Sequence, residues 1–390
     1  MSNLVVRRIG RLTTWTHPRL ADAALAITDG TVSWVGADRD LPAGLADSPE
    51  LDAAGAAVLP GFVDCHTHAV WAGSRRDDVA GRLSGGDYTP AGIASTVGAT
   101  RAASYGELLS LATGRLSAMR RNGTTTVEIK SGYGLTPSDE TRLLEVAREA
   151  AVDCGVGGET TYLGAHVVPD GRDHADYVAE VIAGMAAATA AGAQWCDVFC
   201  DQGAFTVDDA RRILTAAGAA GLGCRIHAEQ LSHTGAAMLA TELGCASADH
   251  LDHVTPADAA AMAAAGVVGV LVPVASLYTR SGRWSHAATL RDAGVTLAVS
   301  TDCNPGTAWC ESMPYAIQLA CLAMALDVDE ALVAATLGGA KALRRNDIGH
   351  LGVGARGDLV VLASDHEADV VAHLGANPVV TTVIAGSVAG

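Results

Sequence analysis

Eight short apolar segments recur between residues 58 and 307, separated by alanine-rich stretches, and most of them end in polar residues. They are VLPGFVDCHTH, TTTVEIKSGYG, ETTYLGAHV, AQWCDVFCDQG, GCRIHAEQ, CASADHLDHV, GVVGVLVPVASL and VTLAVSTDCNPGT. Strands that alternate with helices pair in parallel, and eight such units close into a barrel. The sequence therefore predicts an α/β fold with a (β/α)8, TIM-like barrel over residues 58–345.

The two ends of the chain have a different pattern. AITDGTVSWVG is typical of a β-hairpin with Asp29 and Gly30 as its turn, and GARGDLVVLAS and VVTTVIAGSVAG supply further strands. We expect residues 1–57 and 346–390 to pair into one small β-sandwich domain. Since 49% of the 390 residues are hydrophobic, the chain has enough apolar material for both cores.

Charge and cysteine usage exclude several classes of protein. A net charge of −17 opposes an extended nucleic-acid surface, which needs dense Lys and Arg. The uncharged stretch 259–277 is divided by Gly266 and Pro273, so we reject a membrane span there. Nine scattered cysteines and an N-terminus without a secretory signal indicate reduced thiols in the cytoplasm.

Polar residues gather at the carboxyl ends of the predicted strands, where barrel enzymes place their active sites. His66 and His68 point to the same side of an extended strand, although alone such a pair is more often two hydrogen-bonded polar residues. His227 ends the fifth strand, His250 the sixth and Asp302 the eighth. We expect His66, His68, His227 and Asp302 to hold one divalent or trivalent transition metal ion, zinc or iron, and to leave a position for water.

The layout resembles the amidohydrolase superfamily, and seven segments resemble the imidazolonepropionases of histidine breakdown. They are HTHAVWAGSR, STVGATRAAS, EIKSGYGL, TYLGAHVVP, HAEQLS, ADHLDH and STDCNPGT, in matching order between about residues 55 and 345. The resemblance implies hydrolytic ring opening of 4-imidazolone-5-propanoate, a small anionic molecule, to N-formimidoyl-L-glutamate. It also implies a homodimer.

The resemblance assigns roles to several of these residues. Asp302 is expected to accept a proton from water and to pass one to the departing nitrogen, while His250 stabilises the developing oxyanion. Arg75 matches a position that contacts substrate, and its planar guanidinium suits a carboxylate, although an arbitrary arginine is more often a solvated surface charge. Arg76 is expected at the surface.

Other residues match substrate-binding positions of the family. They are Tyr133 and His166, which could instead be core residues with satisfied polar tips, and Asn304, Gly306 and Thr307, which could instead form a simple turn. Two loops, 85–97 and 271–280, depart from the family pattern and are expected to roof the active site.

The strand-five segment HAEQ bears on the choice of reaction. Related ring deaminases carry a glutamate three residues after this histidine, whereas here the position is Gln230 and Glu229 comes one residue earlier. A glutamine cannot act as an acid or a base, which counts against deamination, and we assign Gln230 to both the substrate-binding and the catalytic residues. Lys130 lies on the second strand rather than the fourth, where two-metal relatives carry a bridging lysine, so one metal is expected.

Two alternatives to this function stay open. One is another cyclic-amide or cyclic-amidine hydrolase, or an aminohydrolase of the same superfamily. The other is a non-catalytic scaffold, which we rank last because the set of candidate metal ligands is intact.

Overall fold

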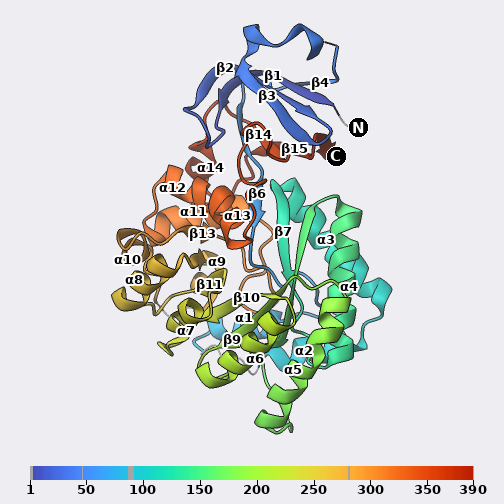
Figure 1. Ribbon diagram of the computed structural model, residues 1–390, viewed down its shortest axis with the longest axis vertical. Helices are drawn as coiled ribbons and strands as arrows, with labels where there is room; N and C mark the ends of the chain where they lie inside the picture. Colours follow the sequence, from blue (N-terminus) through green and yellow to red (C-terminus); the bar gives the residue numbers. More distant parts are fainter. Residues whose placement is uncertain (1–2, 46, 87–91, 280–281, 390) are drawn as a thin grey trace.

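The chain folds into a barrel of eight parallel strands that follow one another in chain order (Figure 1). The computed structural model describes residues 3–45, 47–86, 92–279 and 282–389. Each of the eight apolar segments supplies one strand of the barrel, so the predicted barrel is confirmed. The strands are β6 (Phe62–Asp64), β7 (Thr124–Lys130), β8 (Gly157–Ala165), β9 (Trp195–Cys200), β10 (Gly223–Ala228), β11 (Ser247–His250), β12 (Val268–Leu271) and β13 (Leu297–Val299).

The barrel closes where the chain leaves its first and last strands. Beyond the ends of β6 and β13, Thr67 and Cys303 form a parallel bridge. The backbone N–H of Asp302 donates to the carbonyl of His66 at 3.0 Å, and that of His68 donates to the carbonyl of Cys303 at 2.9 Å. Backbone hydrogen bonds therefore hold three of the predicted metal ligands together.

Helices cover the outside of the barrel (Figure 1). Several begin at hydroxyl residues that cap the first turn: Ser104, Thr206 and Thr255 each accept a hydrogen bond from the backbone N–H three residues later. The helices are α1 (Arg76–Leu83), α2 (Ile93–Ala102), α3 (Tyr105–Arg121), α4 (Pro137–Cys154), α5 (His174–Ala190), α6 (Val207–Ala219), α7 (Ala236–Glu242), α8 (Pro256–Ala265), α9 (Pro273–Thr279), α10 (Ala287–Asp292), α11 (Met313–Met324), α12 (Val328–Val333), α13 (Gly339–Ala342) and α14 (Asp369–Ala372).

The two chain ends form a second sheet, which confirms the predicted small β domain (Figure 1). Asp29 and Gly30 turn the predicted hairpin, both with positive φ, as a two-residue turn requires. The strand order is β16-β15-β14-β5-β1-β2-β3, with β4 beside β1. The bounds are β1 (Leu4–Leu12), β2 (Leu20–Thr28), β3 (Thr31–Ala37), β4 (Glu50–Asp52), β5 (Ala57–Pro60), β14 (Leu359–Leu362), β15 (Val379–Ile384) and β16 (Ser387–Ala389).

The chain passes from this end sheet into the barrel at Gly61. β5 pairs with β1 and β14 in the end sheet, and β6 starts the barrel one residue after Gly61. A Cβ on Gly61 would lie 2.3 Å from the side chain of Thr125, so only glycine fits where the two sheets approach each other. The first apolar segment thus serves both sheets.

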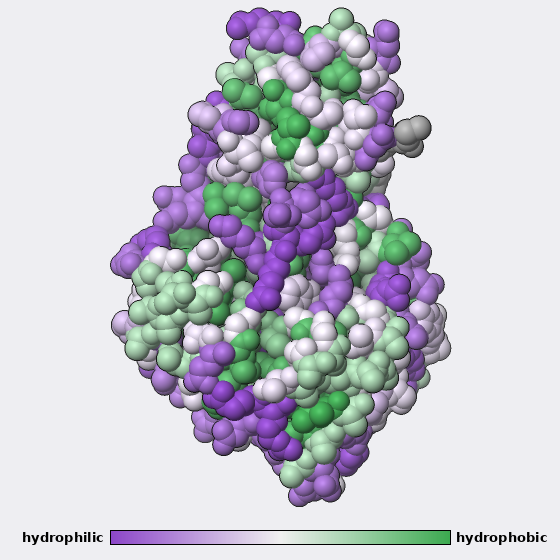
Figure 2. Space-filling view, in the orientation of Figure 1, coloured by the Kyte–Doolittle hydropathy of each residue, from purple (hydrophilic) through white to green (hydrophobic). Residues whose placement is uncertain are grey.

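The surface is hydrophilic where the end sheet and the barrel meet (Figure 2). Figure 2 shows hydrophilic residues across the narrow part of the molecule, where the end sheet meets the barrel. Among the described residues, no helix is long and apolar enough to cross a membrane, and the stretch 259–277 contributes to α8, β12 and α9. All nine cysteines are free thiols.

Candidate active site

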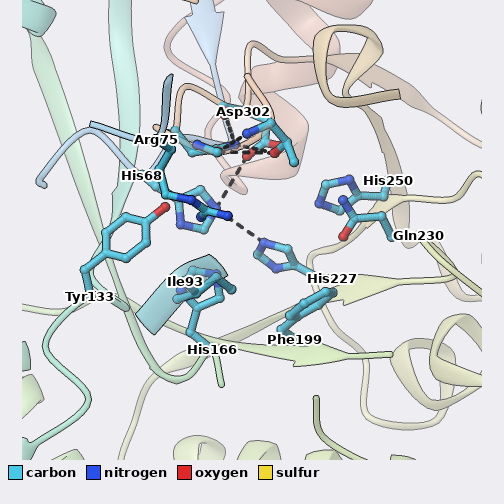
Figure 3. Close-up of a pocket in the computed structure, with 13 residues that line it drawn as sticks. His68, Arg75, Ile93, Tyr133, His166, Phe199, His227, Gln230, His250 and Asp302 are labelled. Carbon is cyan, nitrogen blue, oxygen red and sulfur yellow. Dashed lines mark hydrogen bonds and ion pairs between the residues drawn. The ribbon is translucent and has the colours of Figure 1, made fainter. Parts of the chain in front are cut away.

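A narrow pocket at the carboxyl ends of the barrel strands collects the predicted site residues (Figure 3). Ile93 and Phe199 also line it, and neither was singled out from the sequence. The predicted residues in its wall are His68, Arg75, Tyr133, His166, His227, Gln230, His250, Asp302, Asn304, Gly306 and Thr307. His66 lies against this group, with its ring centroid 4.5 Å from that of His227.

Four of these side chains point their donor atoms at one another. Nε2 of His68 lies 3.4 Å from Nε2 of His227 and 3.5 Å from Oδ1 of Asp302, and Nε2 of His66 lies 3.4 Å from the same oxygen. Ligands held about 2.0–2.1 Å from a tetrahedral zinc ion are about 3.4 Å apart. These three separations match that spacing, and the donor atoms fall into two overlapping triads, His66 with His68 and Asp302, and His66 with His227 and His250, each within 4.8 Å.

The chemistry of the donors also fits a metal. Nε2 of His66 is buried and has no hydrogen-bond partner among the described residues, which is costly unless an ion binds it. Burial lowers the pKa of His66 and of His68 well below the ordinary value, so both imidazoles are neutral, as metal ligands must be. For Asp302, burial by itself raises the pKa well above that of an ordinary aspartate, and a cation bound beside the carboxylate would oppose this shift.

Carboxylates deeper in the barrel orient two of the imidazoles. Nδ1 of His66 lies 2.6 Å from Oδ2 of Asp249, and Nδ1 of His227 lies 3.0 Å from Oδ1 of Asp197. Such an acceptor holds the proton on Nδ1 and leaves Nε2 free to bind a metal. Asp197 and Asp249 were not predicted from the sequence, although an acid inside a buried strand is a signal that could have found them.

His250 stands beside this group in an unusual backbone conformation. Its φ is 79°, and its ring lies 5.3 Å from that of His66 and 5.1 Å from that of His227, measured between centroids. Its ring nitrogens are buried and have no hydrogen-bond partner among the described residues. The nearest nitrogens of His66, His227 and His250 are close enough to share an ion, so His250 competes with the set that includes His68 and Asp302.

Arg75 lies in the pocket wall and is only 5% exposed, whereas Arg76 is at the surface as predicted. Nε of Arg75 lies 2.5 Å from Oδ2 of Asp78, which fixes the guanidinium against the pocket. A Cβ on Gly306 would lie 2.7 Å from Nη1 of Arg75, so glycine permits this approach. Asn304 shapes the same loop, because its Oδ1 accepts from the N–H groups of Gly306 and Thr307 at 2.8 Å each.

Aromatic rings form the opposite wall (Figure 3). His166 stacks on His68 with ring centroids 5.2 Å apart, and its Nδ1 lies 2.8 Å from the carbonyl of Gly132. Burial lowers the pKa of His166 to about 4, which leaves it a neutral hydrogen-bonding group. Tyr133 lies 5.3 Å from His166 and Phe199 lies 5.6 Å from His227, both between ring centroids.

Buried acids hold the loops that carry these walls. Glu140 accepts from three backbone N–H groups of the loop 132–135, and Asp201 accepts from the N–H groups of Gln230 and Leu231 at 2.8 Å. The carboxylate of Glu229 accepts from three N–H groups between residues 234 and 237. Sequence reasoning missed Glu140 and Asp201, because their partners are set by loop geometry rather than by a motif.

The predicted roof loops are described in part. Residues 87–91 of the first loop and Arg280 of the second lie outside the described residues. In the described part of the first loop, Ile93 reaches the pocket.

The model of the amidohydrolase family matches residues 57–389. The imidazolonepropionase of Salinispora arenicola is 50% identical over 376 residues, covering 93% of this chain and 92% of that protein. The imidazolonepropionase of Mycolicibacterium smegmatis is 46% identical over 395 residues, covering 99% of this chain and 96% of that protein. A zinc-bound adenosine deaminase from Xanthomonas campestris has a similar fold, with a TM-score of 0.76, 21% identity, and 99% and 92% of the two chains covered. These matches confirm the resemblance carried by the seven segments.

Proposed function

The chain belongs to the amidohydrolase family and, within it, to the imidazolonepropionases, and on that premise we propose how its residues open the ring of 4-imidazolone-5-propanoate. The reaction adds water across the ring amide and yields N-formimidoyl-L-glutamate. The carbonyl carbon becomes a carboxylate, the bond from this carbon to the ring nitrogen breaks, and the nitrogen takes up a proton. The observation that carries the assignment to this pocket is the convergence of three imidazoles and one carboxylate at its base.

His66, His68, His227 and Asp302 would hold a divalent metal ion, and the proposal is supported by the three short donor separations among them and by the unpartnered Nε2 of His66. When bound, such an ion polarises a carbonyl and lowers the pKa of water. Asp302 is the proton carrier of the site. Its carboxylate, which lines the pocket, would take a proton from water and deliver it to the departing nitrogen.

Substrate orientation follows from the two walls. Arg75 binds the propanoate carboxylate, with its guanidinium fixed by Asp78 and approached closely by Gly306. Tyr133 and His166 pack against the planar ring, and Asn304, Thr307 and Gln230 complete the wall with polar groups. His250 donates a hydrogen bond to the oxygen that gains charge when water attacks the carbonyl.

The carboxylate of Glu229 is engaged, and this counts against deamination. It accepts three backbone N–H groups at 2.6, 3.0 and 3.1 Å and therefore does not reach into the pocket as a proton shuttle. Gln230 lines the pocket in its place, and an amide cannot transfer protons as a carboxylate does. For ring opening, the carboxylate of Asp302 serves as the proton carrier.

We also propose the finer properties of the protein. The ion is zinc or iron, because imidazole and carboxylate ligands suit both. The barrel domain spans residues 58–345, and residues 1–57 and 346–390 form the second domain. The protein acts in the cytoplasm as a homodimer, and sedimentation of the purified protein tests this oligomeric state. It binds no nucleic acid, because its net charge is −17.

The experiment that tests the function combines metal analysis with a substrate panel. Purified protein is assayed with imidazolone propanoate, hydantoin, cytosine and guanine, before and after chelation. We expect activity on imidazolone propanoate, near-stoichiometric metal, and loss of both on chelation. Asp302→Asn should abolish turnover, whereas the matched change Asp292→Asn, at an exposed helix residue, should not. Preference for cytosine or guanine would refute the assignment.

A further inference from the structure

Lys130 is a fully buried cation beneath the pocket. It ends β7, and neither it nor its neighbour Glu128 is exposed to solvent. Its Nζ lies 2.9 Å from Oε1 of Glu128, 2.8 Å from Oδ2 of Asp197 and 3.9 Å from Oδ2 of Asp249. Burying a charge is costly even when it is paired, so the contacts of this lysine call for a physical reason.

Two of these three carboxylates are the ones that orient metal ligands. Asp197 turns one oxygen to Lys130 and the other to Nδ1 and the backbone N–H of His227, at 3.0 and 3.2 Å. Asp249 turns Oδ2 both to Lys130 and to Nδ1 of His66. One ammonium group therefore lies next to both of the carboxylates that set the direction of these imidazoles.

The two carboxylates do not depend on Lys130 equally. Asp249 has a second cation, because Nη2 of Arg225 lies 3.5 Å from its Oδ2. The guanidinium of Arg225 is also committed to the carbonyls of Cys65 and Ala342, at 2.7 and 2.8 Å. For Asp197, by contrast, the lysine lies at contact distance and is its closest cation among the described side chains. His227 therefore depends more on Lys130 than His66 does.

The position of Lys130 also argues against a carbamate bridge between two metals. Its Nζ lies between two carboxylates at less than 3 Å, where a cation is stabilised and a carbamate anion would be repelled. The group thus acts as an ammonium ion.

We infer that Lys130 is a positioning residue for the metal centre: its ammonium group holds Asp197, and more weakly Asp249, as hydrogen-bond acceptors for the Nδ1 protons of His227 and His66. The two rings therefore present Nε2 toward the metal position before the ion binds. This inference rests on the proposed metal site, yet the tautomer that it requires exists in the metal-free protein as well. It can therefore fail while the proposed hydrolysis stands.

The test uses Lys130→Met, which keeps the length of the side chain and removes its charge. The control is Arg345→Met, which breaks ion pairs to Glu159 and Asp347 away from the pocket. Nitrogen-15 spectra of the histidine rings report the tautomers in the metal-free proteins, and competition with a zinc chelator reports the zinc dissociation constant. In the wild-type protein we expect protonated Nδ1 at His227 and His66.

For Lys130→Met we expect mixed tautomers at His227, a smaller change at His66, and zinc binding weakened by about 10- to 100-fold, as for other changes behind metal ligands. Arg345→Met should leave both readouts unchanged. Unaltered tautomers with zinc affinity within about twofold of the wild type would overturn the inference. If Lys130→Met does not fold, Lys130→Met with Glu128→Gln removes one charge of each sign and carries the same test. A wild-type His227 protonated at Nε2 would overturn the inference without any variant.

Discussion

Glu140 offers a sharp test of how the pocket is held together. This residue lies in the first turns of α4 and is 1% exposed, and its carboxylate collects the backbone of the loop that carries Tyr133. Its Oε1 accepts from the N–H groups of Gly134 and Leu135 at 2.8 and 2.6 Å, and its Oε2 accepts from the N–H of Gly132 at 2.6 Å. The division of these bonds between the two oxygens predicts different costs for two substitutions.

Glu140→Gln keeps one carbonyl oxygen, which can serve Gly134 and Leu135, and turns an amide N–H₂ toward the N–H of Gly132. One buried donor is then unsatisfied, at a cost of about 1–3 kcal/mol. Glu140→Ala leaves these three backbone donors and the hydroxyl of Ser131, which also bonds to this carboxylate, without their acceptor, so its cost should exceed about 3 kcal/mol. Because the loop also positions Tyr133, both variants should raise KM for imidazolone propanoate, the alanine variant more.

The assay is urea unfolding of the metal-loaded protein together with steady-state kinetics. Glu149 provides matched controls on the same helix, because its carboxylate accepts from Tyr105 at the surface and Glu149→Gln and Glu149→Ala should cost less than about 1 kcal/mol. Equal unfolding free energies for Glu140→Ala and Glu149→Ala would refute the reasoning. So would a glutamine variant as unstable as the alanine variant.

Three further predictions concern binding, catalysis and pH. Arg75→Met should raise KM by about 10- to 100-fold, as expected when a charge-assisted hydrogen bond is lost. The control Arg76→Met, at an exposed residue, should change neither KM nor kcat. A decrease in kcat with unchanged KM in Arg75→Met would contradict carboxylate binding by Arg75. His250→Phe should lower kcat by about 100-fold, as for the loss of a hydrogen-bond donor to an oxyanion, and should leave the metal content unchanged on elemental analysis. A lower metal content in this variant would instead place His250 among the metal ligands. Burial raises the pKa of Asp252 to about 7 from 3.8, and Ser276 and Ser285 act to lower it. The folded protein keeps this proton while the unfolded chain loses it, so stability falls as pH rises from about 4 to about 7, by at most about 4 kcal/mol. The difference in unfolding free energy between the wild type and Asp252→Asn should follow that curve, and a flat difference would contradict the raised pKa.

Most of the barrel could be predicted from the sequence because eight short, largely apolar segments recur and most of them end in polar residues. The same pattern located His66, His227 and Asp302 at one rim, since parallel strands end at the same side of a barrel. The double role of the first segment was not predicted. The chain leaves the end sheet and enters the barrel at Gly61, where the two sheets approach each other, and no local pattern in the sequence indicates this approach.

The buried acids escaped prediction for two physical reasons. Asp197 lies inside the otherwise apolar strand β9, and Asp249 precedes the predicted site residue His250 in β11. The role of both depends on imidazoles that come from other strands. Glu140 belongs to the first turns of a helix, where acidic residues are ordinary because they favour the helix dipole. Its actual partners are N–H groups of the preceding loop, and no local pattern distinguishes this use from the common one.

Backbone strain coincides with the pocket. Glu229, His250 and Asp302 have positive φ values of 55°, 79° and 52°, a conformation that costs non-glycine residues of order 1–3 kcal/mol each. Each is held by its surroundings: the carboxylate of Glu229 by three N–H groups, the carbonyl of His250 by the hydroxyl of Ser285 at 2.5 Å, and the N–H of Asp302 by the carbonyl of His66. Glycine would relieve the strain at any of these positions, but it would remove the side chain whose direction the positive φ value sets. The rim of the barrel is thus the place where local preference and site geometry oppose each other, and buried polar contacts decide the outcome in favour of the site.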